Sequence, residues 1–174
     1  MSIITKKKFF PIFLPHKHAF VILPEMRDAL VPCFKSISTA EASYNHAMDF
    51  LAESYSNANN YDTYRNDLIV FFCWAYSQGK DVIDITRTDM LAFIRFCNEP
   101  PIELQAKSAR PVLLINKNDE DDLRINPDWS HLKTPIQINH TRVNRRQFRS
   151  SCQSFLLFLY TLMMLNILQS ILRP

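Results

Sequence analysis

Four arginines in the C-terminal part of the chain have the type and spacing needed to bind phosphate groups. They are Arg142, Arg145, Arg146 and Arg149, and no acidic residue lies among them. In a helix, residues spaced i, i+3, i+4 and i+7 share one stripe. Arginine donates bidentate hydrogen bonds to phosphate, and a cationic helix gains affinity for DNA by releasing condensed counterions. A helix with this pattern could therefore contact phosphate groups with one face.

The same predicted helix carries an apolar stripe by which it could pack on the rest of the protein. This stripe consists of Phe148, Cys152, Phe155, Leu156 and Leu159. The alternative interpretation is that the arginines form an ordinary solvated face. Lys80 and Arg87 are secondary DNA-binding candidates because they flank the turn between two predicted helices, and each could equally be a solubilising surface charge.

No pattern indicates a cofactor or a metal ion. The single glycine excludes the glycine-rich loops of P-loop and dinucleotide-binding proteins. The four cysteines lack C-x-x-C spacing and the five histidines are scattered, so we expect no metal site. Reduced, buried thiols are typical of a cytoplasmic protein. The net charge of +3 is too small to indicate nucleic acid by itself.

Length and composition favour one small domain, since the chain has 174 residues and is 47% hydrophobic. The clearest helix signal is an apolar face at helical spacing, followed by Gly79 at a position where a positive φ would end the helix. That face consists of Tyr64, Leu68, Phe71, Phe72 and Ala75. A second helix is predicted to begin with a Thr86–Asp89 capping box and to end before Pro100 and Pro101. Its predicted apolar stripe is Met90, Leu91, Phe93, Ile94 and Cys97.

The remaining segments are predicted more coarsely. Four prolines make residues 1–37 an irregular N-terminal arm. Ser38 and Glu41 predict a capping box for a helix that runs to about Tyr55. Residues 99–140 are expected to form a long inserted loop, with at most a short apolar piece at 112–115 and with Trp129 as its anchor.

The order of these residues resembles the N-terminal core-binding domain of tyrosine recombinases, the phage-integrase family. The resemblance covers about residues 39–162 and is carried by an ordered set: Phe50, Leu51, Tyr64, Asp67, Leu68, Phe71, Trp74, Gly79, Ile85, Thr86, Asp89, Met90, Leu91, Phe93, Ile94, Phe148, Phe155 and Tyr160. It implies an all-α, orthogonal bundle of four or five helices (SAM-like) over residues 38–162. It also implies that the helices bind double-stranded DNA and that other recombinase subunits are partners, with no small-molecule substrate.

The resemblance implies no catalytic activity for this chain. Full-length members continue into a domain with an arginine, a lysine, a His-x-x-Arg pair and a tyrosine nucleophile, and that set is missing here. His140 and Arg142 are one residue too close to form the pair. Because the nucleophile and the groups that stabilise the charged transition state are all needed, we expect DNA binding without strand cleavage by what would be a truncated recombinase.

The C-terminal tail leaves other functions open. From Ser150 to Leu172 no side chain is charged, and residues 163–174 form an atypical apolar tail. A membrane anchor is possible by length, but Asn166 and Gln169 would be costly within it, so a membrane partner is not expected. The tail could instead be a buried last helix or the product of a shifted reading frame. A helical protein-interaction module and a membrane-tail-anchored protein therefore stay as alternatives to the DNA-binding module.

Overall fold

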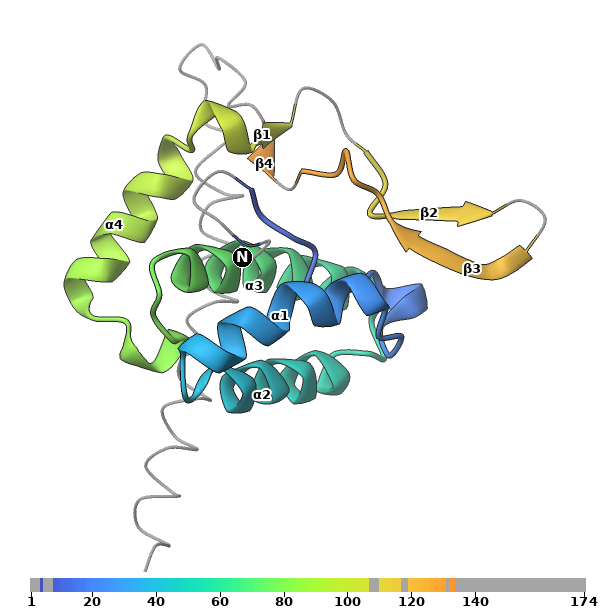
Figure 1. Ribbon diagram of the computed structural model, residues 1–174, viewed down its shortest axis with the longest axis horizontal. Helices are drawn as coiled ribbons and strands as arrows, with labels where there is room; N and C mark the ends of the chain where they lie inside the picture. The colour runs from blue at the N-terminus through green and yellow to red at the C-terminus, as the bar shows by residue number, and fades with distance from the viewer. Residues whose placement is uncertain (1–3, 5–7, 107–109, 117–118, 131, 134–174) are drawn as a thin grey trace, which may run out of the picture.

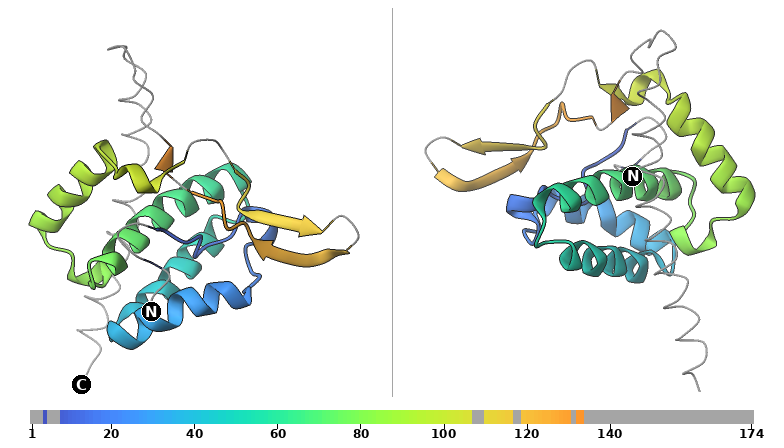
Figure 2. Two further views of the ribbon diagram at one scale, coloured as in Figure 1. Left: turned by 45° about the horizontal axis from the view of Figure 1, so that its top comes forward. Right: turned by 180° about the vertical axis from the view of Figure 1, so that it is seen from behind.

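The computed structural model describes Ile4 and residues 8–106, 110–116, 119–130 and 132–133 (Figure 1). These residues form the helices α1 (Pro24–Ser36), α2 (Ala40–Glu53), α3 (Ala58–Ser77) and α4 (Arg87–Asn98). Short 3-10 turns lie at His16–His18 (η1), Val82–Asp84 (η2) and Ile102–Leu104 (η3). Helices α1, α2 and α3 lie side by side, and α4 stands at one edge of the molecule (Figures 1 and 2). The prediction of a small helical bundle is confirmed in this coarse form.

Helix α3 is the central helix of the bundle. Asn57 begins it, because its side chain accepts a hydrogen bond from the Asn60 amide. The predicted apolar face is buried, apart from Tyr64, which is partly covered. Every residue from Leu68 to Tyr76 is buried, so the helix is covered on all sides there. A helix that is apolar all round is typical of a protein core.

Gly79 ends α3 as predicted, with a φ of +71°. The Lys80 amide donates to the Ala75 carbonyl and the Gly79 amide donates to the Tyr76 carbonyl, at 3.1 and 3.0 Å. These two bonds form a Schellman motif, in which glycine adopts the left-handed conformation at little cost.

The N-terminal segment is not the irregular arm that was expected over residues 1–37. Phe9 to Leu14 run through the core without forming a helix or a strand, and α1 follows. Pro24 occupies the first turn of α1, where a missing amide proton costs nothing. Pro32 lies inside α1 and removes one helical hydrogen bond. Burial of the inner face of α1, formed by Met26, Ala29, Leu30 and Cys33, offsets that loss.

Helix α2 begins differently from the prediction. Its N-cap residue is Thr39 and no side chain caps it, so the expected Ser38–Glu41 capping box does not form. The inner face is largely as predicted, since Tyr44, Ala47 and Leu51 are buried. The helix ends at Glu53, which leaves Tyr55 partly exposed.

The segment expected to be a long loop contains short strands, so the fold is not all-α. Strand β2 (Leu113–Asn116) pairs antiparallel with β3 (Asp119–Ile125), and β1 (Gln105–Ala106) pairs parallel with β4 (Leu132–Lys133). Trp129 is buried, as expected for an anchor. The Asn126 side chain closes the turn before it by donating to the Pro111 carbonyl and accepting from the Asp128 amide. Local polar contacts and one buried indole thus order this region.

Candidate nucleic-acid interface

The junction between α3 and α4 positions the two secondary DNA-binding candidates, Lys80 and Arg87. The predicted capping box of α4 is present: the Asp89 amide donates to Thr86 Oγ1 at 3.2 Å, and the Thr86 amide donates to Asp89 Oδ2 at 2.9 Å. Both partners lie within four residues of each other, which is why the sequence alone could predict the start of this helix.

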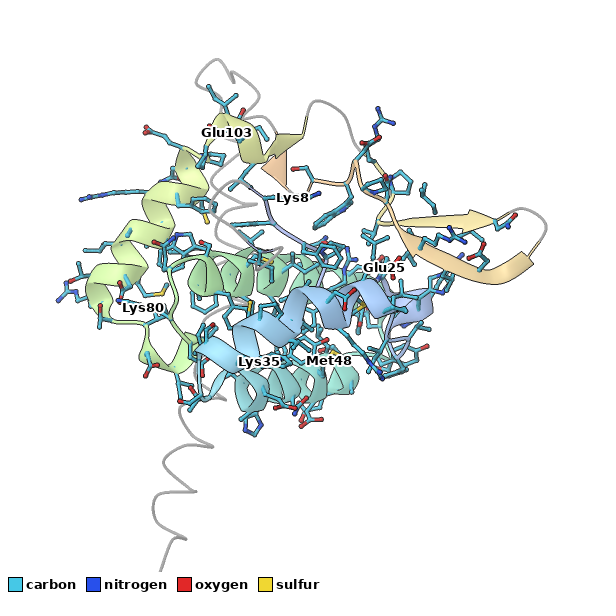
Figure 3. The ribbon with its side chains drawn as sticks, in the orientation of Figure 1. Lys8, Glu25, Lys35, Met48, Lys80 and Glu103 are labelled. Atoms are coloured by element: carbon cyan, nitrogen blue, oxygen red, sulfur yellow. The ribbon has the colours of Figure 1, made fainter. Side chains whose placement is uncertain are left out.

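Lys80 is joined to the same carboxylate. Its ammonium group lies 2.8 Å from both carboxylate oxygens of Asp89, beside the N-terminal end of α4 (Figure 3). Hydrogen bonds from Lys80 and then from Thr86 lower the pKa of Asp89 to about 2. Lys80 therefore ties the end of α3 to the start of α4, and this ion pair competes with any phosphate for its charge.

Helix α4 packs on the bundle through aromatic rings. The ring of Phe93 lies 5.1 Å from that of Phe71 and 5.2 Å from that of Trp74, measured between centroids. Phe96 lies 5.6 Å from Phe9 in the same way. Such separations are favourable for aromatic pairs. No residue of α4 is fully buried, so the helix rests on the bundle instead of entering it.

The predicted apolar stripe of α4 is wrong at one position and incomplete at another. Leu91 is 51% exposed, and Phe96 takes a place in the contact with the bundle. The spacing of Phe96, three residues after Phe93, is the signal that could have identified it.

The outer face of α4 is basic. Arg87, Leu91 and Arg95 are spaced i, i+4 and i+8 and all three are exposed. Eight residues of helix span about 12 Å, which is also about the width of the major groove of B-DNA. Arg95 was not among the predicted site residues, although its distance of two turns from Arg87 could have revealed it. Exposed acids lie at both ends, Asp84 before the helix and Glu99 after it, so the basic surface is confined to this stripe.

Two buried charged groups serve the fold: Asp81 at the junction and Arg65 in the first half of α3. Asp81 is fully buried, and its carboxylate accepts hydrogen bonds from the Ser43 hydroxyl at 2.8 Å and from the Val82 amide at 2.6 Å. It thereby fixes η2 against α2. Arg65 on α3 is also buried, its pKa is lowered by burial, and its Nε lies 3.5 Å from Asp62. Arg65 is therefore not a surface cation.

The four arginines of the predicted DNA-binding helix, Arg142, Arg145, Arg146 and Arg149, lie outside the described residues. Their role stays a prediction. Within the described ranges, no group of histidine, cysteine and acidic residues could hold a metal ion. In the same part of the chain, no helix has both the length and the apolar character needed to cross a bilayer.

Comparison with known proteins identifies no relative. No protein-family model, no curated protein and no solved structure matches this chain significantly. The resemblance to recombinase core-binding domains therefore depends on the ordered residues alone.

Proposed function

We propose that this chain is a DNA-binding helical module of the kind found in tyrosine recombinases, and that it binds duplex DNA without cleaving it. The observation that carries the proposal is the outer face of α4, where Arg87 and Arg95 are exposed with no acid between them on the stripe. The helix is held at one edge of the bundle by Phe93 and Phe96. This leaves the outer face accessible to a groove.

The electrostatics set the expected strength of binding. Each phosphate neutralised by an arginine contributes about 0.9 to the slope of log affinity against log salt. Two arginines alone give a weak, salt-sensitive contact. In this proposal the four arginines at 142–149 supply the rest of the DNA affinity. The predicted DNA-binding residues are these four together with Lys80 and Arg87. Arg95 is added to that set by its position on α4.

The proposal assigns the chain no catalytic step. A tyrosine nucleophile would need arginine and histidine groups around the scissile phosphate, and the sequence lacks the family's set. A cytoplasmic location belongs to the same proposal. The buried, reduced thiols of Cys33 and Cys73 are compatible with it.

Fluorescence anisotropy of a labelled DNA duplex, titrated with the full chain at several salt concentrations, tests the proposal. We expect saturable binding that weakens steeply as salt rises. A supercoiled plasmid incubated with the chain should stay supercoiled and free of covalently attached protein. Absence of binding even at low salt would overturn the proposed DNA binding. Relaxation of the plasmid would instead show that the chain cleaves DNA strands.

A protein-interaction module is the second candidate, and one surface favours it. Phe20, Val21 and Ile22 are consecutive and are 61%, 38% and 57% exposed. The ring of Phe20 lies 5.0 Å from that of the partly exposed Tyr55. Contiguous exposed apolar side chains are typical of interaction sites. Phe20→Asp should leave DNA affinity unchanged if DNA is the ligand, and should abolish capture of a protein partner if this surface is the functional one.

A further inference from the structure

The β2–β3 hairpin projects away from the helices (Figures 1 and 2). Among the described residues it is a two-stranded sheet, so each strand has one edge that pairs with no other strand there. The hairpin is anchored to the core through Leu113, Leu123 and Ile125. An open strand edge is a template for pairing with another chain.

The two open edges differ in charge. Strand β3 carries a run of four acids, from Asp119 to Asp122, and such charges discourage edge-to-edge pairing. Strand β2, with the sequence Leu-Leu-Ile-Asn, has no charged residue. Leu114 and Ile115 are 47% and 53% exposed. Only the β2 edge is therefore suited to accept another strand.

We propose that β2 pairs antiparallel with β2 of a second copy of this chain, about a twofold axis at Leu114. The backbone of β2 favours this register. The Val112 carbonyl accepts from the Asn126 amide and therefore faces β3. Because peptide groups alternate along a strand, those of Leu113 and Ile115 face outward.

An axis at Leu114 places the outward-facing residue Leu113 opposite Ile115 of the second copy, where the two exchange backbone hydrogen bonds. It also places Leu114 opposite Leu114 of the second copy in a non-hydrogen-bonded pair, so all three cross-strand pairs are apolar. An axis at Leu113 would instead oppose Ile115 to Pro111, which has no amide proton to donate. The axis at Leu114 thus lets the amides of both outward-facing residues, Leu113 and Ile115, donate hydrogen bonds.

The charges of β3 agree with this arrangement. In the resulting four-stranded sheet the two acidic strands become the outer edges, three strand spacings apart, or about 14 Å. That exceeds the Debye length of about 8 Å at physiological ionic strength, so their repulsion is largely screened. Pairing through β3 would bring the same acids within one strand spacing, about 5 Å.

The pairing strand is short, so the interface lies at the small end of specific interfaces and the dimer is weak and concentration-dependent. Sedimentation velocity of the full chain over about a hundredfold range of concentration tests this. The parent chain should shift from monomer to dimer. Leu114→Lys should weaken dimerisation at least about tenfold, because it opposes two like charges at the axis. Ile102→Lys is the matched control, since Ile102 is 84% exposed on η3 and should not affect the dimer.

Disulfide trapping tests the register directly. The non-hydrogen-bonded pair brings the two Cα atoms at position 114 to about 4.5 Å, within the range that a disulfide bridges. Leu114→Cys should form an intermolecular disulfide under mild oxidation, whereas Ile102→Cys and the parent chain with its native thiols should not. A monomer at all concentrations, a dimer indifferent to Leu114→Lys, or no link at position 114 would each overturn the proposal. If β2 instead binds a strand of another protein, self-association should be indifferent to Leu114→Lys and no disulfide should form at position 114. DNA binding is measured separately and does not depend on any of them.

Discussion

The hydroxyl group of Tyr44 donates a hydrogen bond of 3.0 Å to the carbonyl of Ile12, 32 residues earlier in the chain. The same buried segment receives two similar bonds, from the Cys73 thiol to the Phe10 carbonyl and from the Tyr61 hydroxyl to the Leu14 carbonyl. Alternate carbonyls of a buried segment are thus satisfied by side chains of α2 and α3 instead of by a neighbouring strand. Buried carbonyls need such partners.

The first prediction concerns this bond. Tyr44→Phe keeps the ring, which stacks on Phe13 at 5.1 Å, but leaves the buried Ile12 carbonyl without its hydroxyl partner. We expect a loss of about 1–3 kcal/mol in the free energy of unfolding, measured by urea denaturation. Tyr55→Phe is the control, because Tyr55 is partly exposed, and it should change stability by less than about 0.5 kcal/mol. Equal midpoints for the two variants would contradict the structural role of the Tyr44 hydroxyl.

The features predicted correctly from the sequence depend on residues close together in the chain. Gly79 and the Thr86–Asp89 capping box act within a single helix end, so their residue types suffice to identify them. The N-terminal segment was mistaken for an irregular arm because its carbonyls are bound by Tyr44, Tyr61 and Cys73, which lie 32 to 63 residues away.

In the candidate site, too, the local features could be predicted from the sequence and the long-range contact could not. The helices that flank Lys80 and Arg87 could be predicted from local patterns. The ion pair between Lys80 and Asp89 could not, because it requires the turn through η2 to bring α4 back beside the end of α3. Strands β1, β2 and β4 are too short for an alternating pattern to be recognised. Strand β3 is longer, but it begins with four acidic residues, a type that is depleted in strands.

A second prediction follows from the left-handed backbone of Gly79. A Cβ atom added there would meet no atom within 4 Å, so any cost of Gly79→Ala comes from its φ of +71° and not from steric crowding. We expect a loss of about 1 kcal/mol for alanine. Asparagine tolerates this conformation better, so Gly79→Asn should lose less. Thermal unfolding of both variants provides the measurement, and an alanine variant as stable as the parent would contradict the Schellman motif.

The third prediction uses the lowered pKa of Asp89. Its value falls from 3.8 to about 2 in the folded chain, so folding favours the ionised carboxylate. The stability from its bonds to Lys80 and Thr86 is therefore fully present above about pH 4 and is lost as the pH falls through about 2. The difference in unfolding free energy between the parent and Asp89→Asn should shrink over that interval. A difference that stays constant with pH would show that the carboxylate's charge does not matter.

A fourth prediction addresses the arginine helix inferred from the sequence. Arg145→Glu combined with Arg146→Glu reverses two charges and should weaken duplex binding and flatten its salt dependence. Lys6→Glu combined with Lys7→Glu makes the same charge change near the N-terminus and serves as the control. If the two double variants weaken binding equally, net charge explains the effect. Unchanged binding in the Arg145 and Arg146 variant would remove that helix from the interface.

The fifth prediction isolates the outer face of α4. Arg87→Gln combined with Arg95→Gln removes two exposed cations without touching the capping box or the aromatic contacts of Phe93. If both arginines neutralise phosphates, the slope of log affinity against log salt should fall by about 1.8, while the thermal midpoint stays unchanged. Arg110→Gln removes an exposed arginine from the segment before β2 and should leave the slope nearly unaltered. Lys80 is held by Asp89. Lys80→Gln should therefore lower the free energy of unfolding but change the slope of log affinity against log salt only slightly. An unaltered slope in the double variant would mean that α4 faces away from DNA, and the basic stripe would then be a solvated surface.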